Sequence, residues 1–288
     1  MNSTSIRDAF EGRGEIIAAG VLWGFAGIFA KMIHGMSAQS IIFYRVTFAF
    51  IILLIFLSIT GNLKKIRLKD KKAYLVLFSM LQLATMLAYF ITIIKASVSV
   101  AVLLLYSAPV YVTVLSPLLL NERSTKKGII ALVLSIAGIL FIVDPEKIGF
   151  SLQSAGIIAG ILSGIAYAFQ IITSKYISKS YPGYTQAFWS FLIASLILLP
   201  AGLVPESVVS GNIIYLILLA IFPTILAVSL YFNGLAKIRA ANASILGLIE
   251  PVSAVILSVL ILNEKLTLLI IIGGALILSG AALVARDR

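Results

Sequence analysis

The chain has 288 residues, of which 61% are hydrophobic and 11% are charged. Soluble globular domains contain about 45–50% apolar and about 25% charged residues, so a water-soluble fold of this length is excluded. Cysteine is absent, which excludes disulfides, thiolate metal sites and cysteine nucleophiles. The net charge of +11 comes mainly from basic residues between apolar runs, so we interpret it as a topology signal and expect no nucleic-acid partner.

Ten stretches are long and apolar enough to cross a membrane, for which a helix needs about 20 mostly apolar residues. In chain order the predicted spans are 15–33, 38–60, 73–94, 97–120, 127–143, 154–174, 185–204, 212–236, 242–262 and 266–285. The polar segment 1–14 has no cleavable signal pattern and is expected to be a cytosolic tail. The sequence thus predicts an all-α, multi-pass plasma-membrane protein in contact with membrane lipid.

Lysine and arginine are distributed unequally between the two sides that these spans define. One side carries 17 of the 22 basic residues, six of them within 64–72, and the other side carries 4, while Arg45 lies inside a span. Cytosolic loops carry the excess of basic residues. We therefore expect both termini in the cytosol, with an extracytosolic linker at 144–153 and a short cytosolic C-terminus at 286–288.

Landmarks of the first half recur in the second half. At a constant offset of 142, Tyr89-Phe90 aligns with Tyr231-Phe232, Pro109-Val110 with Pro251-Val252, and Asn121-Glu122-Arg123 with Asn263-Glu264-Lys265. The predicted repeats are 15–143 and 154–285. Because each holds five helices, an odd number, the second repeat must enter the membrane from the opposite side. Inverted repeats of this kind are typical of secondary transporters.

Several motifs resemble the EamA-type members of the drug/metabolite transporter superfamily. They are Phe43-Tyr44-Arg45-Val46-Thr47-Phe48-Ala49, the run from Lys95 through Pro109 to Asn121-Glu122-Arg123, and Glu250-Pro251 followed by Asn263-Glu264-Lys265-Leu266-Thr267. The resemblance covers about residues 14–285. It implies ten helices, a central cavity between the halves, and export or exchange of small metabolites such as amino acids. Related branches carry nucleotide sugars, sugar phosphates or cationic drugs, and these substrates stay open.

Two charged residues lie deep in the predicted spans. At about 1.5 Å per residue, Glu250 is roughly 12 Å inside the ninth span and Arg45 about 10 Å inside the second. Ionisable groups at such depth are costly and indicate function. Glu250 could accept a proton, meet a substrate ammonium or form a structural ion pair. Arg45 could pair with Glu250, bind a substrate carboxylate or phosphate, or extend to the outer interface.

The remaining candidates are prolines, polar or aromatic residues within spans, and carboxylates at span ends. Pro109 and Pro251 each remove a helical hydrogen bond near mid-membrane and could form a hinge or a packed kink. Residues that could line a cavity are Tyr44, Gln82, Tyr89, Tyr106, Gln170, Trp189, Tyr231 and Asn233. Glu122 and Glu264, at opposite faces, are expected in gate or cap ion pairs.

These observations together predict a secondary transporter of a small organic solute, working by alternating access, with proton coupling as a hypothesis resting on Glu250. The only histidine, His34, lies in an outer loop, so we expect no metal site, and no cofactor motif is present. A channel or lipid scramblase could share such a bundle. An intramembrane enzyme would need a nucleophile and a base within hydrogen-bond reach, and the sequence offers few candidates for either. A monomer and a homodimer both remain open.

Overall fold

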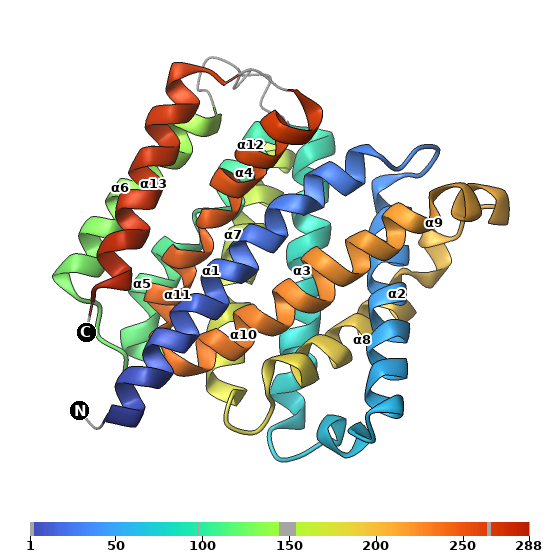
Figure 1. Cartoon of the computed structure of the whole chain (residues 1–288), viewed down its shortest axis with the longest axis horizontal. Helices are drawn as coiled ribbons and strands as arrows, with labels where there is room; N and C mark the ends of the chain where they lie inside the picture. Colours follow the sequence, from blue (N-terminus) through green and yellow to red (C-terminus); the bar gives the residue numbers. More distant parts are fainter. Residues whose placement is uncertain (1–2, 97, 144–153, 264–265, 288) are drawn as a thin grey trace.

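In the computed structural model, which describes residues 3–96, 98–143, 154–263 and 266–287, nearly every residue is helical and no strand is present (Figure 1). The first half contains α1 (Ser3–Lys31), α2 (Ala38–Ile59), α3 (Lys72–Lys95), α4 (Val98–Leu105), α5 (Ala108–Leu119) and α6 (Lys126–Val143). The second contains α7 (Ser154–Ile177), α8 (Gly183–Gly202), α9 (Glu206–Ala220), α10 (Ala227–Lys237), α11 (Ala240–Gly247), α12 (Ile249–Leu262) and α13 (Leu268–Ala285). Two short helices, η1 (Leu63–Ile66) and η3 (Ile221–Leu226), complete the fold.

Within the described residues, nine stretches are long and apolar enough to cross a membrane. Three of them combine consecutive helices: α4 with α5, α9 with η3 and α10, and α11 with α12. The 18-residue helix α6, which packs along α13, is the tenth membrane-length element. The predicted all-α membrane fold is therefore confirmed, and the chain is a multi-pass membrane protein.

Equivalent helices of the two halves make matching contacts with each other. α3 packs along α7, and its counterpart in the second half, the α9–η3–α10 stretch, packs along α1. α2 packs against α8, and α6 packs against α13, so equivalent helices of the two halves contact each other. α6 and α13 lie side by side at one edge of the molecule in Figure 1. Such a pattern is expected when two repeats are related by a two-fold axis. The orientation of the termini across the membrane stays a prediction.

The N-terminal segment differs from the predicted tail, because α1 begins at Ser3 instead of near residue 15. Its polar first turns are held against the end of α10. Lys237 Nζ lies 2.9 Å from a Glu15 carboxylate oxygen and 3.3 Å from one of Glu11. Gly12 permits this approach, since a Cβ there would lie 2.7 Å from Lys237 Cβ. Ion pairs and close packing thus extend the helix beyond the apolar run.

The fourth and ninth spans, predicted as continuous helices, are each broken into two. α4 ends at Leu105 and α5 begins at Ala108, while α11 ends at Gly247 and α12 begins at Ile249. Pro109 and Pro251 lie in the first turns after these breaks. A proline has no N–H to donate and its ring clashes with the preceding turn, so a helix tends to end before it. The breaks occur at equivalent places in the two halves.

Small residues bring α1 and α7 close to the broken spans. A Cβ on Gly24 would lie 2.8 Å from the backbone nitrogen of Ala254 in α12, and one on Gly164 would lie 2.5 Å from the Leu104 carbonyl in α4. Glycine at such crossings lets two helix backbones approach each other. Each broken span is thus packed tightly against the first helix of the other half.

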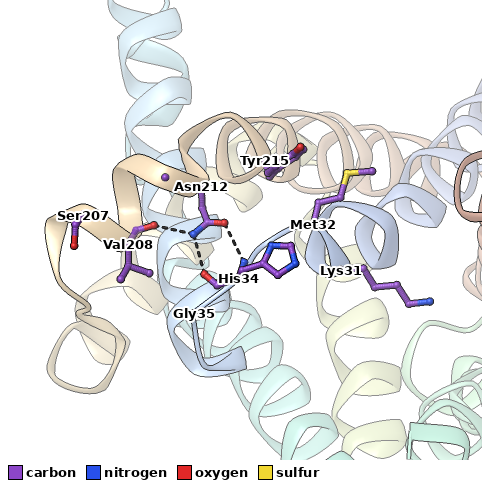
Figure 2. A pocket seen from close by; sticks show the side chains of 9 residues that line it. Lys31, Met32, His34, Gly35, Ser207, Val208, Asn212 and Tyr215 are labelled. Carbon is purple, nitrogen blue, oxygen red and sulfur yellow. Dashed lines mark hydrogen bonds between the residues drawn. The ribbon is translucent and has the colours of Figure 1, made fainter.

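At the end of α1 remote from the N-terminus, α9 holds the connection to α2. Figure 2 shows Asn212 between the two segments: its Oδ1 accepts a hydrogen bond from His34 N at 3.0 Å, and its Nδ2 donates to His34 O at 2.9 Å and to Val208 O at 2.8 Å. A cavity of about 580 Å³ adjoins this contact. The His34 backbone, not its ring, is what Asn212 holds. α9 begins at Glu206, before the predicted 212, so Asn212 lies within it.

Candidate functional site

Glu250 lies in the first turn of α12, directly after the break at Leu248. The first turn of a helix presents unpaired N–H groups and a partial positive charge, which favour a carboxylate there. α1 passes close by, since a Cβ on Gly20 would lie 3.3 Å from Glu250 N. Glu250 is half-buried and not sealed in the core. The break in the ninth span therefore places Glu250 at a helix start, where α1 of the first half packs against α12 of the second half.

The break in the fourth span faces the break in the ninth. Tyr106 lies in the turn between α4 and α5, and its side chain lies close to the Glu250 carboxylate. The side chains of Tyr89 in α3, Tyr167 in α7 and Tyr231 in α10 lie within electrostatic range of the same carboxylate. Four tyrosines from both halves therefore lie in the region of one acid.

One of these tyrosines has unused hydrogen-bonding capacity. Tyr231 is fully buried, and its hydroxyl has no hydrogen-bond partner among the described residues. Its ring packs against Trp23 of α1, with centroids 5.0 Å apart. A buried hydroxyl without a partner is unusual, because desolvation leaves its donor and acceptor uncompensated. The group is therefore available to a polar ligand or water near Glu250.

Arg45 of α2 reaches the η3 segment. Its Nε donates to Thr224 Oγ1 at 2.6 Å, and its Nη2 donates to the Pro223 carbonyl at 3.3 Å. η3 is a π-helical turn, in which the backbone bonds shift by one residue, and such turns occur frequently at functional sites. Thr224 Oγ1 in turn donates to Leu219 O at 2.7 Å, which orients it as an acceptor for Arg45. The guanidinium is thus fixed to η3 by two hydrogen bonds.

Arg45 and Glu250 lie within electrostatic range but form no direct ion pair in the part of the chain that the structure describes. Arg45 is held by η3 through two hydrogen bonds, and Glu250 lies beside Tyr106. Arg45 uses two donors on Thr224 and Pro223, and a guanidinium has five. The remaining donors and the carboxylate are therefore free to act on a third group between them.

Four predicted lining residues have other contacts. The Tyr44 ring packs against Phe43, with centroids 5.0 Å apart. Trp189 Nε1 donates to Ile66 O at 2.9 Å, and Asn233 Oδ1 accepts from Gly183 N at 2.7 Å, both near the η1 end of the molecule. Gln82 accepts a hydrogen bond from Gln170 at 3.4 Å, between α3 and α7. These contacts tie the four side chains to other parts of the fold, and a role for them in solute binding stays a prediction.

Three residues around the charged pair were not among the predicted set: Trp23, Tyr167 and Thr224. Trp23 immediately precedes Gly24, and Tyr167 comes three residues after Gly164. Both glycines mark helix crossings, so their aromatic neighbours must lie near the broken spans. That signal was present in the sequence. Thr224 had no comparable signal, because its role depends on the π-helical turn.

Glu122, predicted in a gate or cap pair, lies in the loop after α5. Its carboxylate accepts a hydrogen bond from Ala240 N at 2.7 Å, at the N-terminus of α11, and lies 3.6 Å from Lys175 Nζ. Lys175 also donates to the carbonyls of Leu235, Ala236 and Ile238 at 2.9, 3.1 and 2.6 Å. This network joins both halves beside a cavity of about 850 Å³. The other predicted gate residue, Glu264, lies outside the described residues.

The arrangement offers charged and hydroxyl groups that can bind a solute. In the described ranges no three His, Asp or Glu side chains gather in a way that could hold a metal ion. The central groups are one carboxylate, one guanidinium and several phenol hydroxyls, contributed by both halves. They suit recognition of a small solute that carries opposite charges.

Comparison with known proteins agrees with this geometry. The profile of the EamA-like transporter family matches the chain twice, over residues 15–144 and 154–286. A protein of Archaeoglobus fulgidus, described as an uncharacterized transporter, is 32% identical over 277 residues, covering 96% of this chain and 97% of its own. The uncharacterized inner membrane transporter YicL of Salmonella typhimurium is 32% identical over 290 residues, covering 96% of each chain. One crystal structure superposes with a TM-score of 0.80 at 17% identity, covering 96% of this chain and 99% of that chain, and supports the fold.

Proposed function

Because the chain belongs to the EamA-like transporter family and is a membrane transporter, we propose that it carries amino acids or closely related metabolites, as an exporter or exchanger working by alternating access. The observation that supports this substrate class is the separation of Arg45 and Glu250. Arg45 is held by Thr224 and Pro223, Glu250 lies beside Tyr106, and the two charged residues share no ion pair within the described residues. A zwitterion placed between them satisfies both charges.

In this proposal the solute carboxylate meets the free Arg45 donors, since a guanidinium matches the geometry of a carboxylate. The solute ammonium meets Glu250, and the surrounding tyrosine faces add attraction for a cation. Multiply charged anions such as nucleotide sugars and sugar phosphates are disfavoured, because a carboxylate beside the site repels them. The symmetry of the fold supports alternating access. In transporters built from inverted repeats, one repeat rocks against the other and opens the site to each membrane face in turn.

Proteoliposome uptake tests the substrate class. Purified protein would be given a mixed pool of amino acids, amines, sugar phosphates and nucleotide sugars, and the accumulated solutes identified by mass spectrometry, with and without a pH gradient. Saturable uptake and counterflow of an amino acid support the proposal. Uptake without saturation or counterflow indicates a pore, and accumulation of only sugar phosphates or nucleotide sugars refutes the assignment.

A matched pair of variants tests the role of Glu250. Glu250→Gln keeps the size of the side chain but removes its charge, and a hydrogen bond to a charged group contributes about 1.5–3 kcal/mol. We expect counterflow affinity to fall by roughly tenfold to a hundredfold, at 1.4 kcal/mol per factor of ten. Glu206→Gln, at the exposed start of α9, is the control and should change nothing. Proton coupling predicts in addition that Glu250→Gln abolishes the response to the pH gradient, and an unchanged response would remove that hypothesis.

A further inference from the structure

A groove opens on the surface between α2 and the η3–α10 stretch. Its volume is about 440 Å³, and ligand pockets commonly measure about 300–1,000 Å³. One wall contains Ile52 and Phe56 of α2, and the other contains Ile225 and Leu226 of η3 with Leu230 of α10. Phe56 is 59% exposed and Leu226 is 41% exposed. Both lie on membrane-length stretches, where an exposed apolar side chain is expected to meet lipid. The groove is therefore open to the bilayer.

The groove is polar at one end. The residues that line this end are Asn62 directly before η1, Lys65 within η1, Tyr184 at the start of α8 and Asn233 of α10. Hydrogen bonds hold these segments together: Thr185 Oγ1 donates to Lys65 O at 3.1 Å, and Gly183 N donates to Asn233 Oδ1 at 2.7 Å. Along the groove the lining changes from apolar, toward the middle of the helices, to polar at the η1 end.

The polar end is positively charged. Among the residues that line the groove the only charged one is Lys65, and no carboxylate is present. The adjoining segment 64–72 contains six basic residues and one acid, Asp70. In the part of the chain that the structure describes, the Lys65 ammonium forms no ion pair, and the Asn233 amide nitrogen makes no hydrogen bond. The end of the groove thus offers unused donors to an anion.

We propose that this groove binds one anionic phospholipid, with its phosphate at Lys65 and Asn233 and an acyl chain along the apolar walls. Charge complementarity and the direction of the polarity support this occupant, because a lipid places its headgroup at the interface and its chain toward the bilayer centre. A soluble anion would use only the polar end and leave the apolar walls without a partner. Basic pockets between membrane helices are a recurring form of headgroup site.

Lipid in the groove would contact the element that positions Arg45. Ile225 and Leu226 belong to η3, whose Pro223 and Thr224 accept the hydrogen bonds from Arg45. An acyl chain against η3 therefore packs on the outer side of the turn that holds the guanidinium. The site is separate from the Glu250 region, so lipid binding can be measured without any transport assay.

Native mass spectrometry of the purified full chain tests the proposal, with phosphatidylglycerol and phosphatidylcholine as probes. The wild type should retain one phosphatidylglycerol in preference to phosphatidylcholine. Lys65→Ala should weaken that retention about fivefold, the order expected for one basic residue at an anionic surface. Its control is Lys72→Ala, in the same basic segment but outside the groove lining.

A second pair of variants tests the apolar part. Leu226→Trp should fill the groove and reduce phosphatidylglycerol retention, while Leu196→Trp, on a 61% exposed position of α8, should not. Equal retention of the two lipids overturns the proposal. Loss in Lys65→Ala but not in Leu226→Trp also overturns it, because the lipid then binds the loop outside the groove. The proposal is also overturned if Lys72→Ala and Leu196→Trp lose as much lipid as Lys65→Ala and Leu226→Trp, because binding is then nonspecific.

Discussion

Replacing Gly24 with alanine tests the close approach of α1 to α12, on which the position of Glu250 depends. The added Cβ would lie 2.8 Å from Ala254 N and 2.8 Å from Ser253 Cβ, whereas ordinary contacts begin near 3.4 Å. Both neighbours are part of a helix, so α1 must move away from α12. Overpacking of this kind costs about 1–3 kcal/mol. Alanine also favours the helix over glycine by about 0.5–1 kcal/mol, which offsets part of that cost.

Gly27→Ala, one turn further along the same helix, separates the two effects. A Cβ at Gly27 has no atom within 4 Å, so this variant gains the helix propensity without the clash. The difference between the variants is then the packing cost alone. At about 2–4 °C per kcal/mol, the order known for domains of 150–250 residues, Gly24→Ala should unfold roughly 2–12 °C below Gly27→Ala.

The measurement is the apparent thermal midpoint of the purified protein in detergent, followed by intrinsic fluorescence. Scan rate and protein concentration are kept equal, because membrane proteins often unfold irreversibly and the midpoint then depends on rate. Equal midpoints for the two variants would refute the reasoning, since α1 and α12 would then not be in contact at Gly24. A displaced α12 should also weaken transport, as Glu250 lies in its first turn.

Two further predictions concern hydrogen bonds between elements. Thr224→Val removes the acceptor for Arg45 Nε, a charged hydrogen bond of about 1.5–3 kcal/mol, and should raise the apparent KM for the transported solute about tenfold or more. Thr85→Val, which loses only a bond within its own helix, should leave KM unchanged, and equal effects would contradict the positioning role. Asn212→Ala should speed hydrogen–deuterium exchange in the α1–α2 connection, whereas Ser210→Ala, which loses a bond within α9, should not; unaltered exchange in Asn212→Ala would show that the contact is dispensable.

Much of the architecture was predictable from the chain alone. The number of membrane-length elements follows from apolar run length, because the bilayer thickness sets how many residues a helix needs. The places of the two helix breaks could be expected from Pro109 and Pro251, since proline removes a backbone donor wherever it occurs. Length and breaks are local properties, and local sequence determines them.

Which side chains meet was decided by the tertiary structure. In a membrane both the lipid-facing and the protein-facing sides of a helix are apolar, so the sequence carries little information on the rotation of each helix about its axis. For this reason the hydrogen bond from Trp189 to Ile66 could not be foreseen, and Tyr167 could be missed although it lies within electrostatic range of Glu250. The π-helical turn that accepts Arg45 depends likewise on packing between α2 and η3. Contacts between helices are set by their rotation and crossing, and only the folded chain defines these.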